Sequence, residues 1–113
     1  MSPDLSAIPS GSSTASPAGQ AGRQLSDTLR LPAIASPMLI VSNPDMVIAQ
    51  CTSGMIGTFP VLNARPQPEL SVWLERIETA LAQARAEGRP VAPHGVNLVI
   101  RAGSDRFADD LAT

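Results

Sequence analysis

Few side chains in this sequence could do chemistry, and the most informative is an amide inside an apolar run. Asn97 interrupts the run Val96–Ile100, and a polar amide in a buried strand must find hydrogen-bond partners. Two interpretations stay open: backbone groups satisfy Asn97, or it points into a cavity and binds a ligand. Met38 follows Pro37 at another predicted strand tip, where packing and ligand contact are the two alternatives.

The other reactive residue types favour structural roles. Cys51 lies in a predicted helix beside apolar residues with no nearby base, so we expect a buried, inert thiol. The single His94 has no second ligand at a metal-binding spacing and is expected to be structural or solvated. Asp105, Asp109 and Asp110 predict a solvated helix face. No phosphate-cradling glycine motif is present. Taken together, these residues predict no catalytic group and no metal site.

Composition narrows the class of protein. The 113 residues are 43% hydrophobic but only 3% aromatic, so a packed core must be aliphatic. The net charge is −2, and the eight basic residues are arginines spread along the chain, which argues against nucleic acid as a partner. No apolar run approaches a membrane span, and no secretory signal is recognisable. With one cysteine, a reducing cytoplasm is the expected location.

The chain divides into a tail and one domain. Residues 1–24 are mostly Ser, Pro, Ala and Gly and predict a disordered tail. Residues 25–113 carry alternating apolar strands and amphipathic helices. The predicted strands are Ala33–Ser36, Met55–Phe59 and Gly95–Ile100. The predicted helices are Pro44–Thr52 with Asn43 as its cap, Pro68 to about Gly88, and a third that Ser104 caps and Asp105 begins.

This order of elements predicts an α/β fold. Apolar strands separated by helices indicate parallel pairing with right-handed crossovers. Three parallel strands would leave two unpaired edges, so we expect the front piece of a larger α/β protein. Ligands of such folds bind where strand tips, loops and helix starts meet, and Leu31–Asp45 is one such place.

Three segments in register with these strands resemble the nitronate monooxygenases, formerly called 2-nitropropane dioxygenases, which are FMN-dependent TIM barrels. They are Pro32–Met38, Cys51–Gly57 and Gly95–Leu98, supported by Leu62–Arg65. The resemblance implies a fold made of the first three β/α units of a TIM (β/α)8 barrel, truncated, over residues 25–113.

The resemblance also implies a flavin site. It implies that Pro37 and Met38 lie along FMN, chiefly through backbone contacts, and that Asn97 hydrogen-bonds the flavin. Leu39 follows where many relatives carry glycine or another small residue, and Asn63 is implied to line the same pocket. The catalytic histidine and the FMN-phosphate loops of the family lie later in the barrel, and this sequence ends before either.

Members of the family oxidise alkyl nitronates with O2, giving a carbonyl compound and nitrite. We therefore expect an FMN-dependent nitronate monooxygenase, represented by a fragment that is inactive alone because a barrel needs about 250 residues. One alternative is a flavin-dependent enoyl- or quinone-reductase of the same superfamily. Another is a non-catalytic remnant that acts only through association.

Overall fold

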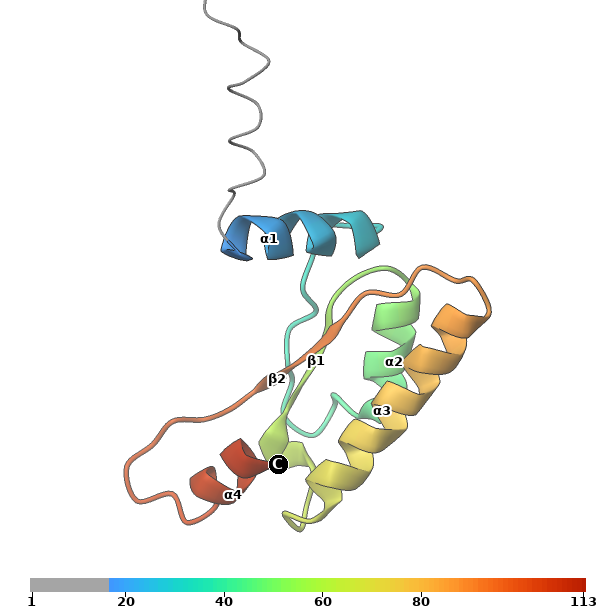
Figure 1. Cartoon of the computed structure of the whole chain (residues 1–113). Coiled ribbons are helices and arrows are strands. Elements are labelled where there is room, and N and C mark those ends of the chain that lie inside the picture. The colour runs from blue at the N-terminus through green and yellow to red at the C-terminus, as the bar shows by residue number, and fades with distance from the viewer. Residues whose placement is uncertain (1–16) are drawn as a thin grey trace, which may run out of the picture.

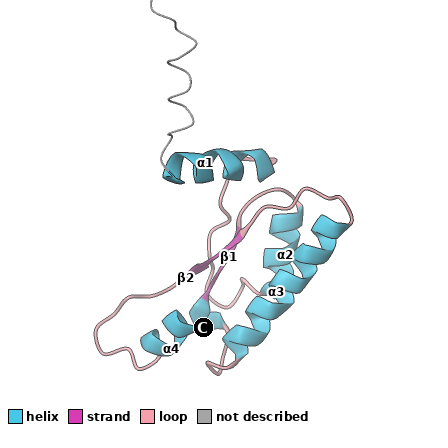
Figure 2. Cartoon of the chain, in the orientation of Figure 1, coloured by secondary structure: helices cyan, strands magenta, loops and turns pink. Residues whose placement is uncertain are grey.

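The computed structural model describes residues 17–113 as four α-helices, two short strands and one 3-10 turn (Figures 1 and 2). The part of the chain that it describes is a small mixed α/β unit. In chain order the elements are α1 (Pro17–Thr28), α2 (Pro44–Thr52), β1 (Gly57–Pro60), η2 (Val61–Asn63), α3 (Glu69–Ala86), β2 (His94–Asn97) and α4 (Phe107–Ala112).

The predicted disordered tail and the structure differ where they overlap. Residues 1–16 lie outside the described residues, but residues 17–24 belong to α1. Proline suits the first helical position because its fixed φ is already helical and its missing N–H is not needed there. Alanine and glutamine, which occur in its first turns, are good helix formers, whereas Gly19 and Gly22 are poor ones.

The described sheet is parallel, as predicted. Gly57 pairs with His94 and Pro60 with Asn97 in the two-stranded ladder of β1 and β2. The predicted strand at Ala33–Ser36 is reduced to one parallel bridge between Ile34 and Ile56. Two backbone hydrogen bonds, Ala35 N–H to Ile56 O and Ile56 N–H to Ala33 O, make this bridge. The ladder goes no further because the Thr58 hydroxyl donates to Ala35 O and Pro37 has no N–H.

Helices α2 and α3 pack together on the same side of the strands (Figure 1). Their buried residues meet Phe59 of β1, whose ring lies 5.5 Å from that of Trp73 at a tilt of 58°. The largest fully buried side chains of this core are Val47, Cys51, Phe59, Leu70, Ile77 and Leu81. The predicted α2 is confirmed, with Asn43 Oδ1 accepting the Met46 N–H at 2.9 Å. The long predicted helix is confirmed as α3, which ends just before Gly88 at φ +79°.

The predicted buried strand Gly95–Ile100 is wrong in length and in burial. β2 ends at Asn97, and Val96, Val99 and Ile100 are exposed. The reason is that β2 pairs only with β1, so within residues 17–113 its outer edge has no neighbouring strand. The two described strands do not test the predicted barrel, which stays a prediction.

The start of the last helix also differs from the prediction. α4 begins at Phe107 rather than Asp105, and Arg106 occupies the cap position. The Ser104 side chain does not cap it; instead the Ser104 carbonyl accepts the Phe107 N–H. No helix among residues 17–113 is both long enough and apolar enough to cross a bilayer.

Candidate functional site

The candidate site is the edge of the sheet where the strands end. Since the paired segments are parallel, their carboxyl ends lie at one edge. Pro37 and Met38 follow the Ile34 bridge, Asn63 follows β1, and Asn97 is the last residue of β2. The topology therefore brings the site residues expected from the sequence to the same edge.

Asn63 and Met38 meet there directly. The Asn63 Nδ2 donates to the Met38 carbonyl at 3.0 Å and to the Ser42 carbonyl at 2.8 Å. Its Oδ1 accepts the Ile40 N–H at 2.9 Å. Both amide protons are thus used within the chain. Asn63 clamps the turn Met38–Ser42, a role that is different from the expected pocket lining.

The clamped turn is tight and strained. The Ser42 N–H donates to the Met38 carbonyl at 3.0 Å, and the Met38 N–H donates to the Ser42 Oγ at 2.8 Å. At its centre Ile40 has φ +70°, the left-handed region that β-branched residues avoid. Met38, Leu39, Ile40 and Val41 are all exposed, with Ile40 at 84%. The turn therefore presents four apolar side chains to solvent at this edge.

Asn97 is exposed, which corrects the expectation of a buried amide. Side chains alternate along a strand, so Asn97 projects from the face opposite to Val96. His94 is on the Val96 side, where its Nδ1 lies 3.3 Å from Glu78 Oε1 on α3. Asn97 is thus on the sheet face away from α3. Both interpretations of Asn97 assumed that its side chain is buried. Because the amide is exposed, it needs no hydrogen-bond partner within the chain.

Cys51 is buried, as expected. Its Sγ donates to the Pro93 carbonyl at 3.4 Å. Burial raises the pKa of the Cys51 thiol, and the Gly57 N–H and the Arg85 charge lower it by less. A thiol that resists ionisation is a poor nucleophile, so this residue serves the core. His94 is half-buried beside Glu78, in keeping with a structural role.

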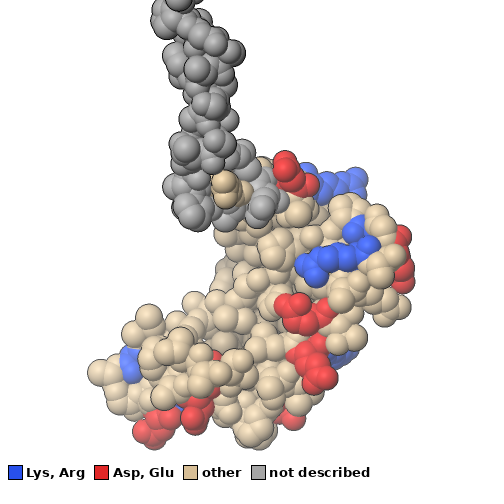
Figure 3. Space-filling model, viewed as in Figure 1, with Lys and Arg blue, Asp and Glu red and all other residues tan. Residues whose placement is uncertain are grey.

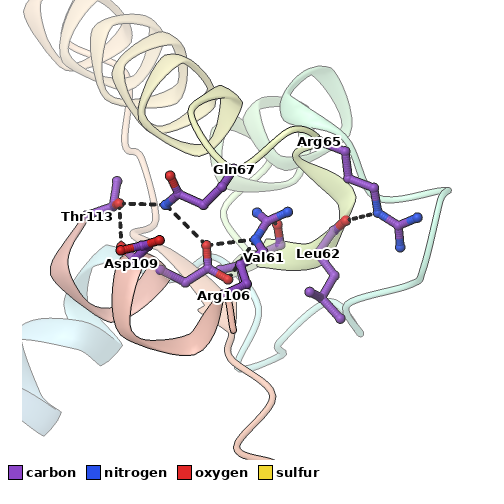
Figure 4. Close-up of polar contacts among 8 residues, drawn as sticks. Val61, Leu62, Arg65, Gln67, Arg106, Asp109 and Thr113 are labelled. Carbon is purple, nitrogen blue, oxygen red and sulfur yellow. Dashed lines mark hydrogen bonds and ion pairs between the residues drawn. The ribbon is translucent and has the colours of Figure 1, made fainter. Parts of the chain in front are cut away.

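Asp110 corrects the prediction of a solvated acidic face. Its side chain is only 2% exposed, and both of its oxygens accept the Arg106 Nε–H at 2.9 Å (Figure 4). The Arg106 Nη2 also donates to the Val61 carbonyl at 2.8 Å, and Gln67 donates to Asp110. These contacts fasten α4 to the loop after β1. The i,i+4 spacing of Arg106 and Asp110 was the signal in the sequence that could have shown this pair.

Charge and metal chemistry add little to this edge. On the face seen in Figure 3 acidic and basic side chains are interspersed, and uncharged surface lies between them. Within residues 17–113 no group of three or more His, Cys, Asp or Glu side chains could hold a metal ion. The interactions that this edge can offer a ligand are therefore hydrogen bonds and apolar contacts.

Comparison with known proteins adds no family: no family model, no curated protein and no solved structure matches this chain. The fit of the edge to FMN can be judged from its own groups. The Met38 backbone and the Asn63 amide are already paired. The exposed Asn97 amide is available, and so is the Leu39 N–H, which has no acceptor among residues 17–113. Two hydrogen-bonding groups and an apolar turn fit the edge of a flavin ring.

Proposed function

We propose that this chain supplies the first β/α units of an FMN-dependent barrel enzyme that oxidises alkyl nitronates with O2. The observation that carries the proposal is the shared edge. Parallel pairing of Ile34, β1 and β2 gathers Pro37, Met38, Leu39, Asn63 and Asn97 where barrel enzymes hold their ligands. Helices α2 and α3 on one side of the strands agree with the outer ring of such a barrel.

Within this proposal each residue has a defined task. FMN would supply the redox chemistry, and the protein would orient the ring and the substrate. The Asn97 amide would hydrogen-bond the ring, and the Leu39 N–H would give a second contact. The apolar side chains of Met38 and Leu39 would lie along the ring. Asn63 would act indirectly, by holding the turn that carries them. We propose the cytoplasm as its location because a chain with a single cysteine forms no internal disulfide.

The exposed edges of the sheet affect how the 113-residue chain should behave on its own. Ile34 on one edge and Val96, Val99 and Ile100 on the other are exposed, and unpaired apolar strands tend to associate. This favours a second candidate, a non-catalytic chain that acts through association. We expect the 113 residues alone to release no nitrite from propyl-2-nitronate in the presence of FMN.

The test is to express the chain together with the polypeptide encoded downstream of it and assay nitrite release. FMN-dependent nitrite release would support the proposal. Replacement of Asn97 by alanine should then weaken FMN binding about fivefold, the value of one hydrogen bond near 1 kcal/mol. Replacement of the exposed Gln83 on α3 by alanine is the control and should change nothing.

Two outcomes would contradict the proposal, and a third would contradict only the expected inactivity of the 113 residues alone. Reduction of quinones or enoyl substrates without nitrite release would favour the reductase alternative. A stop codon with no further strand–helix units, together with self-association of the chain, would favour the remnant. Nitrite release by the 113 residues alone would overturn the expected inactivity.

A further inference from the structure

A cavity of about 320 Å3 lies between β2, α3 and α4. Its walls are mainly aliphatic, contributed by Val61, Leu70, Leu74, Val96, Leu98 and Leu111. Val96 and Leu98 line it, so the intervening Asn97 faces the opposite side of the sheet. The cavity is therefore separate from the candidate site at the carboxyl ends of the strands, and it is independent of the proposed flavin chemistry.

The size and shape of this cavity suit a slender organic molecule. Its volume falls at the lower end of the range for small-molecule pockets, and smaller aliphatic cavities bind apolar guests such as benzene. The lining extends along β2 and its continuation from His94 to Leu98, a distance of about 13 Å for an extended chain. A linear ligand lying along β2 would use this length.

The polar groups of the lining are chiefly hydrogen-bond acceptors. The Asp110 carboxylate, 2% exposed, accepts from Arg106 and from Gln67 at 3.3 Å, which leaves acceptor capacity on its oxygens. His94 Nδ1 lies 3.3 Å from Glu78 Oε1, and the Thr113 hydroxyl, also in the lining, already donates to the Asp109 carbonyl at 2.8 Å. A ligand here should therefore bring a donor.

The same groups select against charged ligands. A fatty carboxylate would gain no hydrogen bond from Asp110, because an ionised carboxylate only accepts and has no proton to donate. An alkylammonium is not required because Arg106 already balances the charge of Asp110. We propose that this cavity binds a straight-chain aliphatic alcohol, with its chain along β2 and its hydroxyl donated to Asp110.

The test is a titration of the 113-residue chain with 1-octanol, followed by 1H–15N NMR. We expect saturable shifts confined to residues of the cavity, and binding at least tenfold weaker for octanoate and for octylamine. Val96→Phe, which fills the cavity, should weaken octanol binding at least tenfold. Val72→Phe is the matched control, since Val72 is a similarly exposed valine on α3 outside this cavity; it should bind as the parent does.

Two results would overturn the proposal. The first is an absence of saturable binding, or equal binding by Val96→Phe and the parent chain. The second is binding of octanoate or octylamine as tight as that of octanol, which would refute the assigned head group. If Val96→Phe fails to fold, Leu111→Trp fills the cavity from the exposed face of α4 and gives the same comparison.

Discussion

The Asn63 side chain accepts the backbone N–H of Ile40 at 2.9 Å, across 23 residues of sequence, and holds Ile40 at φ +70°. The same amide donates to the carbonyls of Met38 and Ser42. One side chain on η2 thus determines the conformation of the turn that follows the first parallel segment. Two loops of the carboxyl edge are coupled through it.

Replacing Asn63 by alanine should destabilise the chain by about 2 kcal/mol, because three hydrogen bonds of about 0.5–1.5 kcal/mol each are lost and the turn is partly exposed. The free energy of unfolding in urea measures this. Asn43→Ala, which removes the single cap bond of α2, should cost about 1 kcal/mol and serves as the control. A loss no larger than that of the control would show that the clamp adds little.

Replacing Ile40 should make the folded chain more stable. A left-handed conformation costs about 1–2 kcal/mol for most residues, whereas asparagine tolerates it. Because Ile40 is 84% exposed, Ile40→Asn gives up little burial and should raise the free energy of unfolding by about 1 kcal/mol. Val41→Asn alters the neighbouring exposed residue, which does not have a positive φ, and should give no gain. Equal effects of the two substitutions would show that polarity, not strain, is responsible.

The two strand glycines should respond oppositely to alanine. A Cβ on Gly57 would lie 2.7 Å from the Val47 carbonyl and 3.1 Å from Cys51 Sγ, so β1 would have to move away from α2. A Cβ on Gly95 would make an ordinary contact, 3.5 Å from Thr58 Cγ2. We expect Gly57→Ala to cost about 2 kcal/mol or more and Gly95→Ala to be neutral or slightly stabilising. Thermal melts of both variants by far-UV circular dichroism would test this.

Much of this fold could be predicted because its signals are local. The Asn43–Pro44 start of α2 and the apolar stripe of α3 with Gly88 after it depend on neighbouring residues, and both helices are confirmed. The strands were harder, since the length and burial of a strand depend on partners far away in sequence. β2 is exposed because nothing in the described residues pairs with its outer edge, and its apolar sequence cannot report that.

The candidate site was predictable in position more than in detail. The first strand tip could be read from Pro37, where the apolar run ends. Asn97 was instead predicted inside a strand that would continue to Ile100. That Asn63 bonds to a turn more than twenty residues earlier could not be foreseen, because the pairing depends on tertiary structure and leaves no spacing signal. The pairing of Asp110 with Arg106 did leave an i,i+4 signal, but the contact of Asp110 with Gln67, over forty residues away, did not.

Cys51 should make stability fall at alkaline pH. Burial raises the pKa of its thiol in the folded state, so the folded chain keeps this proton to higher pH than the unfolded chain does. The resulting stability is complete below the unfolded pKa, about 8.5, and is lost as pH rises through the folded pKa. The chain has no lysine and no tyrosine, so no other side chain titrates in this window.

Urea unfolding at about pH 8, 9 and 10 would measure this loss. In Cys51→Ala the stability should be lower throughout, because a buried side chain is truncated, but its dependence on pH above 8.5 should disappear. An unchanged alkaline slope in the variant would show that another process is responsible.

Asp110 should decide whether α4 stays in place. Asp110→Asn removes the charge that binds Arg106 while keeping nearly the same shape, and it leaves the arginine without its partner near the Val61 carbonyl. Removing one member of a buried pair costs about 3–5 kcal/mol, and somewhat less here because Arg106 is 20% exposed. Since these polar contacts fasten α4 to the residues after β1 (Figure 4), the cost should appear as local detachment. Amide exchange of Phe107–Ala112 should quicken at least tenfold while exchange in α3 stays unchanged.

Asp109→Asn, at an exposed carboxylate on the same helix, is the control and should leave exchange in α4 as it was. Equal acceleration in both variants would contradict a specific role for Asp110.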